Sequence, residues 1–194
     1  MRNNSVIILA GGRASRLGIA KTLVTHPAFK GYWLEEQIRQ LTQIGISEII
    51  VVLGFHAERE LRELPKTLAA KFVINPLPER GHFSSLQEGL RSLEKKTSFV
   101  LPIDVPAPKQ SVWEDLDRAM RTGIKVCTPV SNQKGGHPVL LSENFCRELM
   151  VMDPIESRLD RIIQSLQIAE VARVPVTHST IHLNLNRAQD WREI

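Results

Sequence analysis

The sequence of 194 residues is poor in aromatic side chains and in cysteine, and both shortages exclude classes of protein. Aromatic residues make up 5% of the chain and no basic run is interleaved with them, which disfavours a nucleic-acid surface built on base stacking. The two cysteines, Cys127 and Cys146, form no CxxC pair and belong to no Cys/His cluster with zinc spacing. Isolated cysteines of this kind are typical of reduced thiols, so we expect a reducing compartment.

Long apolar stretches are missing as well. The apolar run at residues 6–10 follows the polar residues 1–5 and is too short for a secretion signal, which also needs a cleavage site of small residues. No other run approaches the length that spans a bilayer. We therefore expect a cytoplasmic protein with no membrane or nucleic-acid partner.

The composition and length fit an ordinary globular protein. Hydrophobic residues make up 42% and charged residues 24% of the chain. The length corresponds to a single domain over residues 1–194, which buries enough surface to fold without disulfides or a structural metal. Lys and Arg number 25 against 21 Asp and Glu, and this net charge of +4 mildly favours anionic partners.

Short apolar runs recur at regular intervals and predict a parallel sheet. Continuous runs suit strands that are covered on both faces, and here they lie at residues 6–9, 49–53, 72–74 and 99–101. Leucine and isoleucine recur between them with helical spacing, at residues 34–44 and 86–93. Strands that alternate with helices predict an α/β fold.

The second half of the sequence has a weaker pattern. Ser142 carries the hydroxyl of a helix N-cap, and we expect a helix over residues 143–150 behind it. Strands are expected at residues 125–130, 137–141 and 181–185, and a closing helix is expected at residues 187–194.

The first predicted strand runs into a glycine-rich loop, which begins with Leu9, Ala10, Gly11 and Gly12. Glycines at the carboxyl end of a strand let the backbone approach a ligand, and their amides can point at phosphate oxygens. The cations of Arg16 and Lys21 follow the loop and can neutralise a triphosphate. Arg13 stands where a dinucleotide fingerprint needs glycine, and the Walker A ending is missing. The alternative is a strand–turn–helix junction with two solvated bases.

Two polar groups could form a metal site. Asp104 lies where the fourth predicted strand ends, and Mg²⁺ takes carboxylate and phosphate oxygens, although an Asp near a proline also forms turns. Alternation along a strand at residues 181–185 would place His182, Asn184 and Asn186 on one face, from which an asparagine could complete the site. The alternative is a polar strand face that ends in a turn.

Two further segments could contact substrates. Asn75 follows the third predicted strand, and Gly81, Ser84 and Ser85 come just before or within the start of the next helix. We expect these residues to line a nucleobase pocket, and the alternative for the serines is helix capping alone. His137 follows a glycine pair and could contact the second substrate, or it could be a surface histidine.

Read together, five segments resemble the nucleotidyltransferase family that includes the molybdenum-cofactor cytidylyl- and guanylyltransferases. The resemblance spans almost the whole chain, and its order and spacing carry more information than any single motif. The segments are residues 9–18 with Lys21, residues 75–90, residues 101–106, residues 136–140, and residues 182–186 followed by residues 189–191.

The resemblance implies a Rossmann-like three-layer α/β/α fold with a mostly parallel central sheet, as in nucleotide-diphospho-sugar transferases. It implies that the loop amides hold the nucleotide, that Arg16 and Lys21 hold its β- and γ-phosphates, and that Mg²⁺ is bound by Asp104 with Asn184 or Asn186. Ala20 stands where relatives often have proline, and residues 25–31 have no obvious counterpart. These departures concern the acceptor more than the chemistry.

The implied reaction is in-line attack by an acceptor phosphate on the α-phosphorus of an NTP, with CTP or GTP favoured and pyrophosphate released. A phosphate acceptor such as molybdopterin is already ionised, so no general base is required. One alternative acceptor is a sugar 1-phosphate or an alcohol phosphate. An alternative of another class is a nucleotide-binding protein without catalysis.

Overall fold

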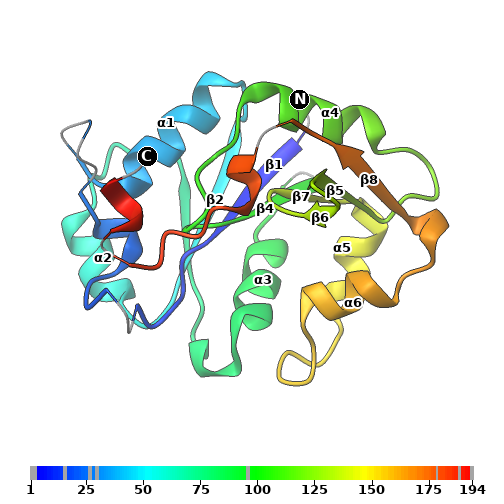
Figure 1. Cartoon of the computed structure of the whole chain (residues 1–194). Helices are drawn as coiled ribbons and strands as arrows, with labels where there is room; N and C mark the ends of the chain where they lie inside the picture. Colours follow the sequence, from blue (N-terminus) through cyan, green and yellow to red (C-terminus); the bar gives the residue numbers. More distant parts are fainter. Residues whose placement is uncertain are drawn as a thin grey trace.

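A computed structural model describes residues 4–14, 17–25, 28, 31–94, 97–177, 179–187 and 189–192. Its centre is an eight-stranded sheet in the order β3-β2-β1-β4-β7-β5-β6, with β8 paired to β5 (Figure 1). The strands are β1 (Asn4–Leu9), β2 (Glu48–Leu53), β3 (Lys71–Ile74), β4 (Thr97–Pro102), β5 (Val126–Ser131), β6 (Lys134–Gly135), β7 (Val139–Leu141) and β8 (Val171–Pro175).

The sheet is mostly parallel. Strands β1 to β4 run parallel to one another, and β8 runs parallel to β5. Strand β7 is antiparallel to both β4 and β5, and β6 is antiparallel to β5. The carboxyl ends of β1, β2, β3 and β4 therefore meet at one edge, where open α/β sheets bind ligands.

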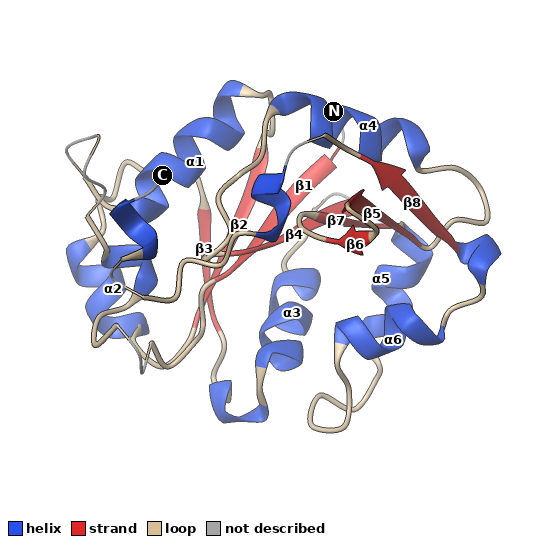
Figure 2. Cartoon of the chain, viewed as in Figure 1, coloured by secondary structure: helices blue, strands red, loops and turns tan. Residues whose placement is uncertain are grey.

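Helices cover both faces of this sheet, which gives three layers (Figure 2). They are α1 (Trp33–Gln43), α2 (Ala57–Glu63), α3 (His82–Arg91), α4 (Gln110–Ala119), α5 (Glu143–Met150) and α6 (Leu159–Ser165). Side chains of α1 and α4 form one core cluster with Val6 and Ile8, while side chains of α3 and α5 form another with Ile7. Alternate side chains of β1 thus pack against the helices on opposite faces of the sheet. This arrangement confirms the predicted Rossmann-like α/β/α fold.

Several short 3₁₀ helices complete the fold, and two of them replace predicted elements. They are η1 (Lys21–Leu23), η2 (Pro78–Arg80), η3 (Ile168–Glu170), η4 (Ser179–His182) and η5 (Asp190–Arg192). The predicted strand at residues 181–185 is wrong, because η4 ends at His182 and the following residues have no regular structure. Ile181 and Leu185 are nevertheless buried, so their apolar pattern reflects packing rather than pairing.

The closing helix predicted at residues 187–194 is also wrong in extent. Among its described residues the structure contains only the turn of η5, which buries Trp191 against Trp33 with 5.1 Å between the ring centroids. The predicted N-cap is confirmed, since the Ser142 hydroxyl accepts a hydrogen bond from the Phe145 amide at 3.4 Å. Over the described ranges, we find no helix that is both long and apolar enough to span a membrane.

Candidate active site

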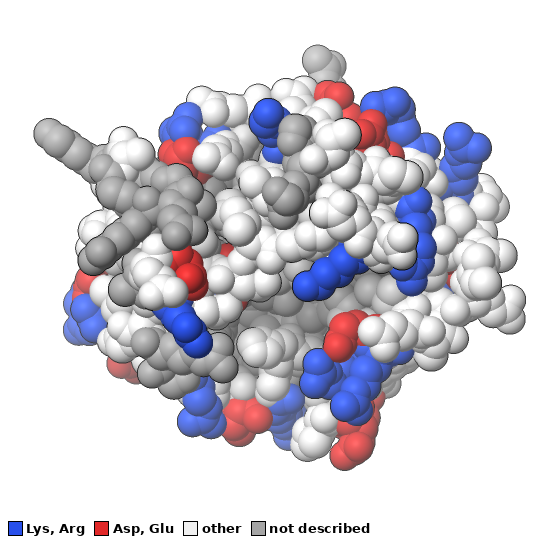
Figure 3. Space-filling view, viewed as in Figure 1, with Lys and Arg blue, Asp and Glu red and all other residues white. Residues whose placement is uncertain are grey.

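A cleft of about 590 Å³ opens at the carboxyl edge of β1 and β4. The space-filling view shows this face hollowed at its centre, with Lys and Arg side chains at the border of the hollow (Figure 3). Its walls come from the loop after β1, the end of β4, the start of α3 and Asn186 near the end of the chain. Its lining includes Leu9, Ala10, Gly11, Gly12, Lys21, Gly81, Ser85, Asp104 and Asn186.

The glycine-rich loop is held against the next strand. The Ala10 amide donates a hydrogen bond to the Val52 carbonyl at 2.9 Å. A Cβ atom on Gly54 would lie 2.6 Å from the Gly11 carbonyl oxygen, and one on Gly11 would lie 3.0 Å from the Ser85 hydroxyl. Glycine is therefore required at position 54, where the new Cβ would meet backbone, whereas a Cβ on Gly11 would press on a serine side chain. Gly12 differs, because a Cβ there would meet no atom within 4 Å.

The far end of the loop packs on residues that follow β2. The guanidinium of Arg13 lies 4.2 Å from the centre of the Phe55 ring, a cation–π contact. The His56 Nε2 atom lies 3.0 Å from the Arg13 carbonyl oxygen. Ala14 has a φ of +52°, and its carbonyl accepts hydrogen bonds from the amides of Leu17 and Gly18. Arg16, the predicted partner of Lys21, lies outside the described residues.

Lys21 joins parts of the chain that are distant in sequence. Its ammonium donates a hydrogen bond of 2.7 Å to Asp104 Oδ2, 83 residues away, and one of 2.8 Å to Asn186 Oδ1, 165 residues away. The side chains of Lys21 and Asp104 are 18% and 21% exposed, so this pair lies in the cleft wall and not on the open surface. The predicted convergence of an early base with a central acid is present in the fold.

The final segment is fixed to the sheet by backbone contacts. The Leu185 amide donates to the Asp104 carbonyl oxygen at 2.8 Å. The Asp190 carboxylate accepts hydrogen bonds from the amides of Arg187 and Asn186, at 2.7 and 2.8 Å, and these bonds hold its pKa below the usual range. Asp190 thus orients the turn that presents Asn186. Sequence reasoning missed this role, and no local signal in the sequence marked it.

A second contact that the sequence did not predict is made by the residue after Lys21. The neighbouring Thr22 is buried and donates a hydrogen bond of 2.5 Å to Glu60 Oε1 in α2. Glu60 is 1% exposed, and its Oε2 has no hydrogen-bond partner in the described structure. Burial raises the pKa of the Glu60 carboxyl, and the hydrogen bond from Thr22 opposes that shift.

The predicted nucleobase residues divide into two groups. Gly81 and Ser85 line the cleft, as expected. Asn75 is 2% exposed, and its amide nitrogen donates to the hydroxyls of Ser84 and Ser85 at 2.8 and 3.0 Å. The Ser84 hydroxyl in turn donates to the Gly81 carbonyl at 2.7 Å. Asn75 and Ser84 therefore do not line the cleft themselves but hydrogen-bond to Ser85 and Gly81, which do.

The predicted metal and acceptor residues also differ in position. Asn186 and Asp104 both accept a hydrogen bond from the Lys21 ammonium. Asn184 is instead exposed, and its side chain donates to the His182 carbonyl at 3.1 Å. His137 does not line the cleft; it is half-buried, and its Nδ1 is buried without a partner in the described part of the chain. Burial lowers the pKa of His137, and the nearby charge of Asp104 opposes that shift.

The oxygens of Asp104 and Asn186 fit a hard divalent cation. Both already meet a single positive charge, the Lys21 ammonium, at hydrogen-bond distance. Mg²⁺ is often held by one or two protein oxygens together with substrate phosphates and water. Within the described ranges no three His, Cys, Asp or Glu side chains gather as a metal cluster.

Comparison with known proteins adds three findings. A family model described as the MobA-like NTP transferase domain matches residues 6–171. The bifunctional protein GlmU of Oceanobacillus iheyensis is 26% identical over 86% of this chain and 37% of its own, and a probable molybdenum cofactor guanylyltransferase of Rhodopirellula baltica is 32% identical over 52% and 47%. The chain thus spans less than half the length of these curated relatives. The structure of Rv0371c from Mycobacterium tuberculosis in complex with manganese has a TM-score of 0.77 at 16% identity, over 98% of this chain and 97% of that one.

Proposed function

Because this chain belongs to the family of the MobA-like NTP transferase domain, as the sequence indicated, we propose that it is a nucleotidyltransferase. It transfers a nucleoside monophosphate from an NTP to a phosphorylated acceptor and releases pyrophosphate. The observation that carries this proposal is the meeting of Lys21 with Asp104 at 2.7 Å, in a cleft that begins with a glycine-rich loop. A cation for the phosphates, a carboxylate for a metal ion and a glycine-rich loop for the nucleotide are the groups that suit NMP transfer.

The triphosphate lies along the loop after β1. Gly12 faces open space, so its backbone can approach phosphate oxygens without obstruction. Lys21 stabilises the negative charge that grows on the departing pyrophosphate, and Arg16 is proposed to share this task. Gly81 and Ser85 form the wall beside the base, with CTP or GTP as the favoured nucleotide.

Asp104 and Asn186 hold the divalent cation, which we propose is Mg²⁺. When bound, this ion neutralises phosphate charge near the α-phosphorus. The similar structure that contains manganese supports a divalent ion in this fold. The Leu185 amide anchors the backbone of Asp104 through its carbonyl, and the Asp104 carboxylate contacts Lys21.

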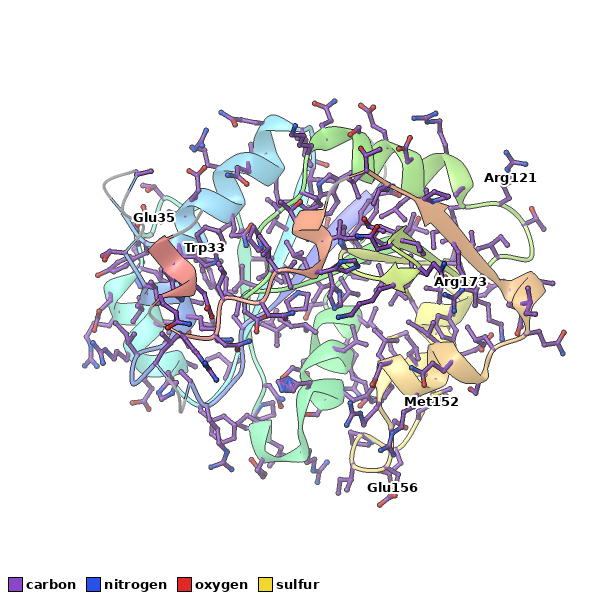
Figure 4. All side chains as sticks on the ribbon, in the orientation of Figure 1. Trp33, Glu35, Arg121, Met152, Glu156 and Arg173 are labelled. Carbon is purple, nitrogen blue, oxygen red and sulfur yellow. The ribbon has the colours of Figure 1, made fainter. Side chains whose placement is uncertain are left out.

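The acceptor enters from the side of β5 and β8. Ala172 and Val174 pack into the cluster of α1 and α4, so Arg173 projects from the other face of β8, toward α5 and α6 (Figure 4). Arg173 and Lys134 are both exposed, and they suit an anionic acceptor. The similarity to a probable molybdenum cofactor guanylyltransferase favours a molybdopterin-type phosphate.

The test measures pyrophosphate release from each of the four NTPs with Mg²⁺ and a panel of phosphorylated acceptors. Molybdopterin, a sugar 1-phosphate and phosphocholine represent the three acceptor classes. We expect release with one nucleotide and one class, and its loss when Mg²⁺ is chelated. Tight NTP binding without release for every acceptor would instead identify a nucleotide-binding protein without catalysis.

A further inference from the structure

The Lys21 ammonium stands where a bound metal ion would stand. It contacts Asp104 Oδ2 at 2.7 Å and Asn186 Oδ1 at 2.8 Å, and these are the two oxygens assigned above to the cation. One ammonium therefore donates a charge-assisted hydrogen bond to each of the two oxygens. A divalent ion that bound the same two oxygens would lie closer to each of them, because metal–oxygen distances for Mg²⁺ are about 2.0–2.1 Å.

Both ligands are held in place independently of Lys21. Leu185 donates its amide to the Asp104 carbonyl, and Asp190 binds the backbone of Asn186. The backbone positions from which the two oxygens project thus do not depend on the lysine. Lys21, in contrast, has a long flexible side chain that lines the open cleft.

We propose that Lys21 holds the cation position in the nucleotide-free protein, so that the metal enters together with the triphosphate and not before it. This inference rests on the proposed function, which supplies the metal and the nucleotide. The triphosphate offers Lys21 new anionic partners along the loop, and the ammonium moves from Asp104 to the phosphates as the divalent ion arrives. The exchange keeps Asp104 paired in both states, which avoids an uncompensated carboxylate in the cleft wall.

The test measures Mn²⁺ binding to the nucleotide-free protein by the loss of the free-ion signal in electron paramagnetic resonance. We expect Lys21→Met to bind Mn²⁺ at least about tenfold more tightly than the wild type, because the competing charge is gone. The double variant Lys21→Met/Asp104→Asn should lose this gain, which assigns the new site to Asp104. Circular dichroism and melting temperature check that each variant is folded.

Arg13→Met provides the matched control. Arg13 also lines the cleft and carries one positive charge, but its guanidinium packs on Phe55 and not on Asp104. Its removal should leave Mn²⁺ affinity near the wild-type value. An equal gain in Arg13→Met would overturn the inference, because the effect would then be one of net charge.

One other outcome also rejects the inference. A folded Lys21→Met protein that binds Mn²⁺ no more tightly than the wild type would show that Lys21 is no obstacle. A thermal-shift assay of the wild type with GTP or CTP, with and without Mn²⁺, separates this result from failure of the proposed function. Stabilisation by nucleotide and Mn²⁺ leaves that function intact, whereas no response to either nucleotide counts against the function itself.

Discussion

Strands β1 to β4 and strands β5 to β8 form two parts of one sheet that differ in regularity. In the first part, parallel pairing joins β1 to β4 from Asn4 to Leu9, and the side chains of Val6, Ile7 and Ile8 are fully buried. In the second part, β7 pairs with β5 at Val126 and Cys127, and β8 is half-exposed along its length. The loop and Asp104 directly follow strands β1 and β4 of the first part.

Exposure of apolar side chains follows the same division. Val151 and Ile155, in the loop between α5 and α6, are 85% and 66% exposed, and Ile168 in η3 is 96% exposed. The first part also has exposed apolar residues, Ile74 and Leu77, but at 49% and 38% they are less exposed than these three. We propose that the first part holds the nucleotide and that the second part holds the acceptor. The following predictions test this division of tasks.

The largest effect is expected for Lys21→Ala, which removes the cation from the regular part. We predict that turnover falls by about 10²–10³, as for the loss of a donor that stabilises charge in the transition state. The measurement is pyrophosphate release at saturating NTP and acceptor. Lys109→Ala, an exposed lysine before α4, is the matched control and should keep wild-type turnover. Normal turnover in Lys21→Ala would reject the assigned role of this residue.

Gly54→Ala tests whether the loop depends on its rigid support. The new Cβ would lie 2.6 Å from the Gly11 carbonyl oxygen, so we expect a loss of about 1–3 kcal/mol in unfolding free energy together with weaker NTP binding. Gly12→Ala meets no atom within 4 Å and should weaken NTP binding without lowering stability. Chemical denaturation and nucleotide titration measure both quantities, and an unchanged denaturation midpoint in Gly54→Ala would contradict the packing argument.

Arg173→Ala tests the second part of the sheet. We expect the KM for the acceptor to rise by about two- to fivefold, since an exposed charge contributes little, while the KM for NTP stays constant. Arg121→Ala serves as a control, because Arg121 is exposed in the loop that follows α4, well away from α6 (Figure 4). A change in the NTP constant for Arg173→Ala would show that the two parts share one binding surface.

Glu60→Gln should have the smallest effect, and its sign depends on pH. Because burial raises the pKa of Glu60 in the folded protein, its contribution to stability is greatest below the pKa of the free carboxyl and is lost as the pH rises through the raised value. The neutral amide should therefore raise the melting temperature near pH 7, by about 2–4 °C for each kcal/mol recovered. No gain is expected in acid, where Glu60 is already protonated.

Glu58→Gln is the matched control for this pH profile. Glu58 lies in the same helix and is exposed, so its replacement should leave the melting temperature almost unchanged across the pH range. A destabilised Glu60→Gln protein at neutral pH would show that the carboxylate form supports Thr22 and that burial is not the dominant effect.

The first half of the fold could be predicted from the sequence because its apolar runs are continuous. Strands β1, β2, β3 and β4 each coincide with a predicted run, and the family is confirmed. The proximity of Lys21 and Asp104 followed from one rule, that the carboxyl ends of parallel strands meet at one edge. The roles assigned to these residues stay predictions.

The remaining errors have a common physical cause, since tertiary contacts decided what local patterns left open. Apolar residues at positions 181 and 185 suit a strand, yet η4 and a loop bury both side chains against the sheet. Asn75 follows a strand as a ligand-binding residue would, but its side-chain amide donates hydrogen bonds to two serine hydroxyls. Spacing alone does not show whether a polar group faces a cleft or braces its wall.

The hydrogen bond from the Leu185 amide to the Asp104 carbonyl can form only late in synthesis. The strands that carry the loop and Asp104 leave the ribosome first and can begin to fold as a unit. Asn186 reaches its place only after residues 185–190 have emerged, because the Leu185 amide and the Asp190 carboxylate position it. A nascent chain would therefore hold an almost complete sheet while still lacking one of the two oxygens that we propose for the cation.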